Sequence, residues 1–370
     1  MTTLHALTEL GQSVWLDDMR RSYLRSGRLE AFLLQGIRGV TTNPTIFYRA
    51  ITGSEEYDRQ IEDLACIGQS AYQIYEALIL EDVGRAADQL RPIYEETGGV
   101  DGYVSLEVSP RLARDTRGTI AQAQRLYSTL GRPNVMIKVP GTPQGLPAIR
   151  ALIAARVNVN VTLLFSLPQY EAVLEAYMAG LEDLAAVNGN LSGVASVASF
   201  FVSRIDTAVD AALDTLGYDE LKGKAAVASA RVAYAHFRAV IEDERWTALA
   251  QRGARIQRPL WASTSTKNPD YPDTLYVDSL IGPDTVTSLP VPTIEAFLAH
   301  GTVSNTLDDG LDEARDYLAQ LVDLGIDLTA VGERLQDDGI TAFVESFDAL
   351  QDAIAEKRIA CADVSNGHQS

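Results

Sequence analysis

The feature that most limits the possible folds is a regular alternation, along the whole chain, of short apolar segments with longer amphipathic ones. The short segments are rich in β-branched residues, and the longer ones repeat their apolar positions at the period of a helix. We expect eight strands, at residues 13–17, 38–42, 102–108, 134–139, 157–164, 193–199, 258–263 and 284–289. We expect helices between them, over residues 56–66, 70–90, 110–130, 143–155, 168–188, 203–216 and 218–242.

The expected strands are mostly apolar throughout, which is typical of a parallel sheet covered on both faces. Eight such strands in βα order predict an α/β fold, a single closed (β/α)8 TIM barrel. Residues 307–357 contain no strand pattern, so we expect additional C-terminal helices packed on the barrel. We assign residues 1–360 to this one domain and expect residues 361–370 to form a disordered tail.

The composition limits the possible partners. Asp and Glu outnumber Lys and Arg by 50 to 31, and a surface this acidic repels nucleic acid and anionic membranes. The two cysteines, Cys66 and Cys361, fit a reducing compartment better than a disulfide framework, and no signal segment or membrane span is evident. The four histidines are scattered and suggest no metal site. We expect a cytoplasmic protein, monomeric or homodimeric, without nucleic-acid or membrane partners.

Lys138 is the most informative single residue. It is the only lysine before Lys222, and it lies inside the apolar segment 134–139, in a chain that otherwise prefers arginine. A desolvated lysine can lose its proton and attack a carbonyl to form a Schiff base, which an arginine cannot do. The alternative is a lysine that starts inside the barrel and snorkels to solvent at the strand end. This residue alone leaves both interpretations open.

Polar residues recur at the carboxyl ends of the predicted strands, where the active sites of TIM barrels form. They are Asp17, Asn43, Glu107, Lys138, Asn160, Thr162 and Ser199. Each alone could cap a helix, form a turn or satisfy a buried group. Six strands that present polar groups toward one mouth are costly for a core and well suited to a polyhydroxylated substrate.

Five motifs, in order and at barrel spacing, resemble the transaldolase family. They are Gly39–Pro44, Ser105–Val108, Ile137–Pro140, Asn158–Ser166 and Ala198–Asp206. The similarity extends over about residues 10–350, and the segment Trp261–Thr264 resembles the longer bacterial branch of the family. The resemblance implies an enzyme without a metal or other cofactor that transfers a dihydroxyacetone unit between phosphorylated sugars. The unit would pass from sedoheptulose 7-phosphate to glyceraldehyde 3-phosphate, giving erythrose 4-phosphate and fructose 6-phosphate.

The resemblance also implies a role for each matching residue. Lys138 takes the position of the Schiff-base lysine, and Asp17 that of the acid/base in carbon–carbon cleavage. Glu107, with Thr162 and a water molecule, matches the pair that moves protons while the carbinolamine dehydrates. The positions that hold the donor hydroxyls and the enamine are Asn43, Ser105, Asn160 and Ser199.

The expected phosphate site departs from the family pattern. Arg204 matches the family arginine and starts a predicted helix, where backbone amides also favour an anion. Lys267 stands where many members have arginine, so the site keeps the charge but loses a bidentate fork. Ser265 is assigned to the same site, although the register of the Ser/Thr-rich loop before Lys267 stays open.

The sequence also allows two alternative functions. One is a fructose-6-phosphate aldolase-like enzyme, and the other is a sugar-phosphate-binding barrel without catalysis. Phe201 argues against the first alternative, because members of the fructose-6-phosphate aldolase branch usually have tyrosine there as the proton donor to the enamine. The presence of Lys138, Asp17 and Glu107 together argues against the second.

Overall fold

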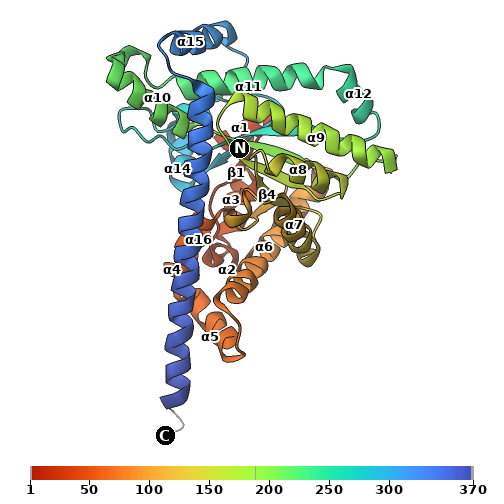
Figure 1. Cartoon of the computed structure of the whole chain (residues 1–370), viewed down its shortest axis with the longest axis vertical. Helices are drawn as coiled ribbons and strands as arrows, with labels where there is room; N and C mark the ends of the chain where they lie inside the picture. Colours follow the sequence, from red (N-terminus) through yellow and green to blue (C-terminus); the bar gives the residue numbers. More distant parts are fainter. Residues whose placement is uncertain (1, 188, 368–370) are drawn as a thin grey trace.

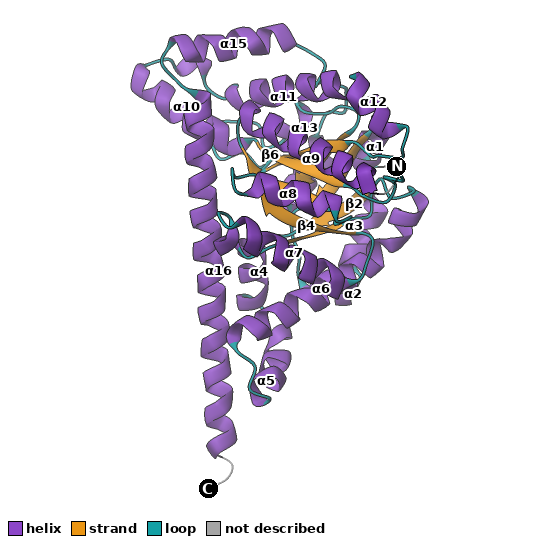
Figure 2. Cartoon of the chain, turned by 45° about the vertical axis from the view of Figure 1, so that its right-hand side comes forward, coloured by secondary structure: helices purple, strands orange, loops and turns teal. Residues whose placement is uncertain are grey.

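The computed structural model describes residues 2–187 and 189–367, and its centre is a closed barrel of parallel strands with helices around it (Figures 1 and 2). The strands are β1 (Gln12–Leu16), β2 (Ile37–Thr41), β3 (Val104–Glu107), β4 (Val135–Pro140), β5 (Val159–Leu164), β6 (Ser196–Phe201), β7 (Gln257–Ala262) and β8 (Thr285–Leu289). They follow one another round the barrel in chain order, and β8 pairs with β1. The predicted (β/α)8 barrel is confirmed, and every strand overlaps the segment predicted for it.

Helices cover the outside of the barrel and continue past the last strand. They are α1 (Thr3–Glu9), α2 (Arg21–Ser26), α3 (Arg28–Gln35), α4 (Pro44–Thr52), α5 (Asp58–Cys66), α6 (Ala71–Glu96), α7 (Thr116–Leu130), α8 (Gly145–Ala154), α9 (Leu167–Val187), α10 (Ser203–Leu216), α11 (Ala225–Ile241), α12 (Glu244–Ala250), α13 (Leu275–Asp278), α14 (Val291–His300), α15 (Leu311–Asp323) and α16 (Leu328–Gly367). With the helices around the barrel, nearly all strand residues are buried, as is typical of a parallel sheet covered on its outer face.

Two helices start later than predicted. α7 begins only after Asp115, whose carboxylate accepts a hydrogen bond from Gly118 N at 3.0 Å and so caps the helix. α11 begins only after Gly223, whose φ of +71° lies in the left-handed region and cannot continue a right-handed helix. The predicted starts at Pro110 and Tyr218 are therefore wrong, because short 3-10 turns precede both helices.

The register of the strands brings the predicted catalytic positions side by side. Glu107 on β3 lies opposite Lys138 on β4, and Lys138 lies opposite Asn160 on β5. Thr162 lies opposite Pro140, two residues nearer the carboxyl end of β5. Three neighbouring strands thus present a carboxylate, an amine and an amide at one level of the barrel.

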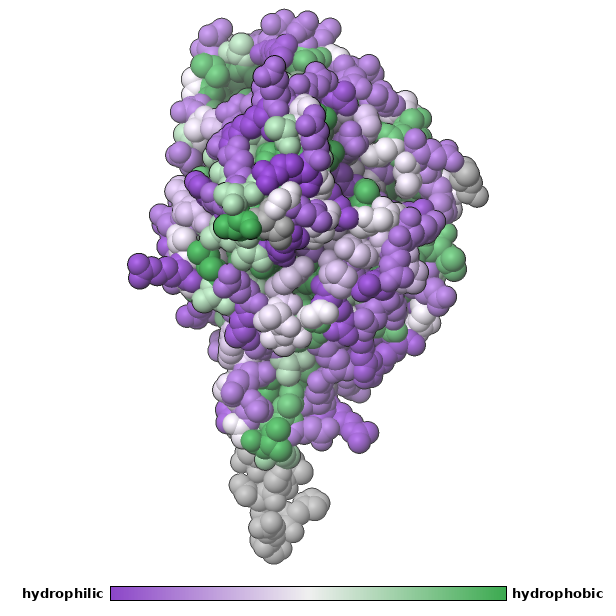
Figure 3. All heavy atoms as spheres, turned by 90° about the vertical axis from the view of Figure 1, so that its right-hand side faces the viewer, coloured by the Kyte–Doolittle hydropathy of each residue, from purple (hydrophilic) through white to green (hydrophobic). Residues whose placement is uncertain are grey.

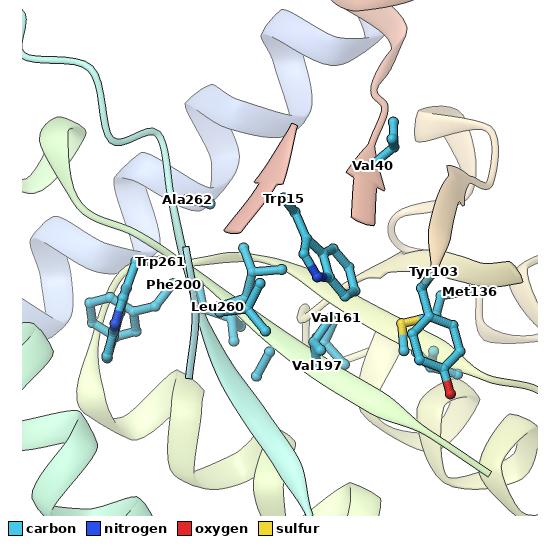
Figure 4. Close-up of a cluster of buried hydrophobic side chains, with 14 of the residues drawn as sticks. Trp15, Val40, Tyr103, Met136, Val161, Val197, Phe200, Leu260, Trp261 and Ala262 are labelled. Carbon is cyan, nitrogen blue, oxygen red and sulfur yellow. The ribbon is translucent and has the colours of Figure 1, made fainter. Parts of the chain in front are cut away.

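Large aromatic side chains fill the barrel and its contacts with the helices (Figure 4). Trp15 and Trp261 are fully buried, and the ring centroid of Trp261 lies 6.2 Å from that of Phe200 in an edge-to-face arrangement. A Cβ atom at Gly39 would lie 2.6 Å from the Trp15 ring, so only glycine fits there. The interior of the barrel below the carboxyl ends of the strands is therefore a packed core and not a pore.

A buried ion pair closes the amino-terminal end of the barrel. Arg258 on β7 lies 3.0 Å from Asp101 Oδ1, and it also donates to Ser13 Oγ and Val100 O, each at 2.7 Å. Ser13 Oγ donates to Asp101 Oδ2 at 2.6 Å, and Trp15 Nε1 donates to Asp101 Oδ1 at 3.3 Å. Every charge in this network, which we call the lower network, therefore has a partner within the protein.

The C-terminal helices pack on the barrel, as predicted. α16 runs along one side of the molecule from α10 past α4 to α5 (Figure 2). Gln336 in α16 donates to Gly141 O at 3.1 Å and to Leu163 O at 3.0 Å, so the helix is fixed to the carboxyl ends of β4 and β5. α16 is described as far as Gly367. The disordered tail expected over residues 361–370 stays a prediction, and residues 368–370 lie outside the described part of the chain.

The outer surface in Figure 3 is mainly hydrophilic, with apolar residues in scattered areas. Within residues 2–187 and 189–367, no helix combines the length and the hydropathy that a membrane crossing requires.

Candidate active site

A cavity of about 260 Å³ opens at the carboxyl ends of the strands, where the predicted catalytic residues gather. Of the predicted site residues, the cavity is lined by Asp17, Asn43, Lys138, Ser199, Phe201, Arg204, Ser265 and Lys267. The other four, which do not line it, are Ser105, Glu107, Asn160 and Thr162, all buried on β3 and β5. Eight predicted residues therefore line the cavity, and the other four lie buried at the same end of the barrel.

Lys138 extends from β4 into the interior of the mouth. The residue is only 4% exposed, and its Nζ donates to Thr42 O at 3.0 Å. Its Nζ also lies 3.5 Å from Glu107 Oε2. Lys138 therefore does not snorkel to the outer surface, and its amine faces a cavity large enough for a small substrate.

Glu107 has the environment of a carboxyl group that can both give and take a proton. Burial raises its pKa to about 7, although the nearby charge of Lys138 opposes this rise. Neither carboxylate oxygen has a hydrogen-bond partner among the described residues, and the same is true of Thr162 Oγ1. A group that titrates near neutral pH is suited to general acid/base work.

Asp17 follows β1 directly, and its backbone N donates to Leu289 O at 2.8 Å, so the residue continues the strand pairing. Its Oδ1 accepts a hydrogen bond from Thr41 Oγ1 at 2.7 Å, and Thr41 Oγ1 lies 3.0 Å from Ser288 Oγ. Burial raises the pKa of Asp17, while the bond from Thr41 and the charge of Lys138 act against this rise. The Thr41 hydroxyl, itself hydrogen-bonded to Ser288, thus holds the Asp17 carboxylate in one orientation.

A hydrogen-bonded row orients the polar side chains beside Lys138. Asn160 Nδ2 donates to Ser105 Oγ at 3.0 Å, and Ser199 Oγ donates to Asn160 Oδ1 at 2.7 Å. Asn43 serves a structural purpose as well, because its Oδ1 accepts from Ile46 N at 3.0 Å and caps α4. The row spans β3, β5 and β6 and can present hydroxyl and amide groups to a polyol.

Two predicted cationic side chains, Arg204 and Lys267, also line the cavity, from the start of α10 and from the loop after β7. The Arg204 guanidinium lies over the Phe201 ring, 5.6 Å from its centroid, and Lys267 Nζ donates to Ser265 Oγ at 2.7 Å. Burial lowers the pKa of Arg204, and burial together with the charge of Arg204 lowers that of Lys267. The structure thus brings the three predicted phosphate-binding residues to one cavity, which can accept an anion.

Several lining residues were not predicted. They are Thr41, Thr45, Ile46, Arg49, Leu260, Ala262, Ser263, Thr264, Ser288, Pro290 and Phe343. Thr41 lies within a motif already singled out, so its position could have been found from the sequence. Arg49 and Phe343 come from α4 and α16, and no strand-end signal marks them. Among the described residues, no group of three or more His, Cys, Asp and Glu side chains is arranged to hold a metal ion.

The comparisons with known proteins agree with this architecture. The family model "Transaldolase/Fructose-6-phosphate aldolase" matches residues 14–354. A transaldolase of Thermobifida fusca is 48% identical over 362 residues, which cover 96% of this chain and 98% of that protein. A transaldolase of Trichodesmium erythraeum is 44% identical over 373 residues, with 96% and 98% covered. Transaldolase 1 of Streptomyces avermitilis is 48% identical over 357 residues, with 95% and 94% covered. The barrel, the interior lysine and these full-length similarities together mean that the chain belongs to the transaldolase/fructose-6-phosphate aldolase family and is an enzyme of the transaldolase type.

Proposed function

We propose that this enzyme transfers a dihydroxyacetone unit from sedoheptulose 7-phosphate to glyceraldehyde 3-phosphate through a Schiff base on Lys138. The products are erythrose 4-phosphate and fructose 6-phosphate. The observation that carries the proposal is the buried amine of Lys138, which faces the cavity 3.5 Å from a carboxylate whose pKa is raised to about 7. An amine in this position can form an imine, and the adjacent carboxyl group can supply and remove the protons that imine formation needs.

In the first half of the reaction, Lys138 Nζ attacks the ketone carbon of the donor and forms a carbinolamine. Loss of water then gives an iminium ion. Glu107 protonates the departing hydroxyl group, and Thr162 and a bridging water molecule complete the proton path. The free hydrogen-bonding capacity of the Glu107 carboxylate and of Thr162 Oγ1 supports this assignment.

Asp17 acts in the next step. Its carboxylate removes the proton from the hydroxyl group on C4, the C3–C4 bond breaks, and the bonding electrons move into the iminium to give an enamine. The aldehyde product leaves, and the acceptor aldehyde enters. The enamine carbon then attacks the acceptor carbonyl, and Asp17 returns its proton. Water adds to the resulting iminium, and the C–N bond of the carbinolamine breaks to release the ketose product and the free amine of Lys138. The location of Asp17 on the cavity wall, held by Thr41, supports this role.

The remaining predicted residues bind the substrate. The row of Ser105, Asn160 and Ser199 would hold the donor hydroxyls and the enamine, and Asn43 would contribute from the start of α4. Arg204, Lys267 and Ser265 would bind the phosphate group. In the proposed reaction the iminium is itself the electron sink, so neither a metal nor an organic cofactor is needed. A cytoplasmic enzyme, monomeric or homodimeric, would suit these substrates.

Phe201 bears on the aldolase alternative. Its ring lines the cavity and packs 5.2 Å from the Phe165 ring, and it carries no hydroxyl that could protonate the enamine. The enamine should therefore wait for an acceptor aldehyde.

The experiment is to follow fructose 6-phosphate with and without erythrose 4-phosphate, then to reduce the enzyme with borohydride in the presence of fructose 6-phosphate. We expect acceptor-dependent turnover, unchanged by a metal chelator, and a dihydroxyacetone-derived mass on the peptide that carries Lys138. Release of free dihydroxyacetone without acceptor would favour the aldolase alternative. Labelling of Lys222 or Lys267 instead would contradict the assignment.

A further inference from the structure

We propose that Arg49 in α4 is a third phosphate-binding side chain, which completes with Arg204 and Lys267 a three-sided cationic cradle. This inference rests on the proposed function, because it assumes a phosphorylated sugar in the cavity. It adds a specificity-determining residue from an element that carries none of the proposed catalytic groups.

Arg49 lines the same cavity as the other two cations but approaches it from another wall. Arg49 lies in α4, which follows β2, whereas Arg204 starts α10 after β6 and Lys267 lies in the loop after β7. A phosphate group between these walls could therefore meet positive charge from both sides of the mouth.

The side chains are close enough for their charges to interact. Burial lowers the pKa of Lys267, and the positive charges of Arg204 and Arg49 lower it further, while Asp17 acts in the opposite direction. Three like charges in one cavity repel each other, and a bound dianion removes that repulsion.

Among the described residues, Arg49 and Arg204 lack a direct carboxylate partner. Burial lowers the pKa of Arg204, and the charge of Asp338 acts against this lowering only from beyond ion-pair distance. Neither side chain forms an ion pair with a residue in the described part of the chain. Other arginines at the surface do, as Arg111, Arg150 and Arg245 each hold a carboxylate oxygen at 2.6 to 2.7 Å. In a chain with 50 acidic and 31 basic residues, partners are plentiful. Cations left without them at a cavity wall are therefore suited to an external anion.

The chemistry of the three side chains is complementary. Lys267 is a point charge that already donates to Ser265, whereas the Arg49 guanidinium offers a planar fork that can bind two phosphate oxygens. Arg49 can thus supply the bidentate contact that a lysine at position 267 cannot.

α4 is held firmly enough to aim this side chain. Asn43 caps its first turn, and Phe47, Ala50 and Ile51 are buried against the core. Thr45 Oγ1 lies 2.8 Å from Ser346 Oγ, which ties α4 to α16. A fixed helix limits the freedom of Arg49 to its own side chain, so less entropy is lost when phosphate binds.

The test compares Arg49→Gln and Arg49→Lys with a matched control, Arg25→Gln. Arg25 also lies in the last turn of a short helix, is exposed, and lines no part of the active-site cavity. The steady-state constants are measured with fructose 6-phosphate and with unphosphorylated fructose as donor, and the affinity for inorganic phosphate is measured by calorimetry.

We expect Arg49→Gln to raise KM for fructose 6-phosphate and Kd for inorganic phosphate about tenfold each, the effect of one lost charge-assisted contact. The kcat value and the rate with fructose should change little in Arg49→Gln. For Arg49→Lys, KM and the phosphate Kd should lie between those of the parent enzyme and of Arg49→Gln. Arg25→Gln should match the parent enzyme in all of these constants. An unchanged phosphate Kd in Arg49→Gln, or an equal loss with fructose, would overturn the proposal. If the parent enzyme shows no acceptor-dependent turnover but Arg49→Gln still weakens phosphate binding, the proposed function fails and the cradle stands.

Discussion

The two ends of the barrel treat their charges in opposite ways. At the amino-terminal end, the lower network pairs Arg258 with Asp101 at 3.0 Å and adds hydrogen bonds from Ser13 and Trp15. At the carboxyl end, the closest ion pair of the mouth joins Lys138 to Glu107 at 3.5 Å. The Glu107 oxygens have no hydrogen-bond partner among the described residues. The buried charges at the amino-terminal end are thus paired and hydrogen-bonded, whereas those at the carboxyl end are not fully hydrogen-bonded within the described part of the chain.

This difference separates stability from function. A buried charge destabilises a fold unless it is paired and hydrogen-bonded, and the lower network meets that condition. At the carboxyl end, buried charged groups lack full hydrogen bonding within the described part of the protein, which lowers the stability of the fold. Such groups, with perturbed pKa values, are typical of sites that act on a substrate. Changes at the mouth should therefore affect turnover, and changes at the lower network should affect unfolding.

The largest effect is expected from Lys138→Arg, which keeps the charge but cannot form an imine. Turnover should fall below detection, and no adduct should be trapped by borohydride, while the thermal unfolding midpoint stays close to that of the parent enzyme. The control is Lys222→Arg, at a partly buried lysine that pairs with Asp214 and Asp219 and does not line the cavity, and this variant should remain active. Appreciable activity in Lys138→Arg would remove the basis for the Schiff-base mechanism.

Asp17→Asn and Glu107→Gln should each lower kcat by about 10²- to 10⁴-fold, the usual range for a lost general acid/base group. They should differ in trapping, because they serve different steps. Asp17→Asn should still form the adduct on Lys138 but fail to cleave the carbon–carbon bond, whereas Glu107→Gln should form the adduct slowly. Single-turnover trapping measures both, and the reverse pattern would mean that the two roles are exchanged.

Asp101→Ala should lower the free energy of unfolding by about 3–5 kcal/mol, because it leaves Arg258 buried without its partner. KM for fructose 6-phosphate should stay unchanged. Urea unfolding measures the effect, with Asp88→Ala as the control. Asp88 pairs with Arg132 at 2.7 Å but is 62% exposed, so its removal should cost about 1 kcal/mol or less. Equal losses in the two variants would contradict the contrast between the barrel ends.

The smallest expected effect is a pH dependence of stability from Glu107. Its pKa is raised from 4.5 to about 7 in the folded state, so the folded protein binds the proton more tightly than the unfolded chain. The contribution of Glu107 to stability is therefore full below pH 4.5, declines as the pH rises toward 7, and is constant above that. Relative to the parent enzyme, Glu107→Gln should gain stability over this window. Urea unfolding between about pH 5 and pH 8 would measure the gain, and a flat difference would contradict it.

The sequence predicts the barrel well because buried parallel strands are apolar along their whole length. Every strand overlaps its predicted segment, whereas α7 and α11 start later than their apolar periodicity predicts, because a capping aspartate and a left-handed glycine determine where the two helices begin. The strand-end residues, such as Lys138 and Asp17, could be identified because a barrel brings strand ends together. Arg49 and Phe343 could not, since their place at the cavity depends on how α4 and α16 pack.

The position of α16 has a consequence for how the enzyme matures. The helix contributes Phe343 to the cavity wall, and a Cβ atom at Gly339 would lie 2.9 Å from Leu163 Cδ2 and 3.4 Å from Arg204 Nη1. Synthesis proceeds from the amino terminus, so all eight strands leave the ribosome before this wall does. A nascent barrel can therefore close and protect its core while its mouth is still unfinished. The cavity that we expect to bind the substrate is then completed only when α16 packs beside Arg204.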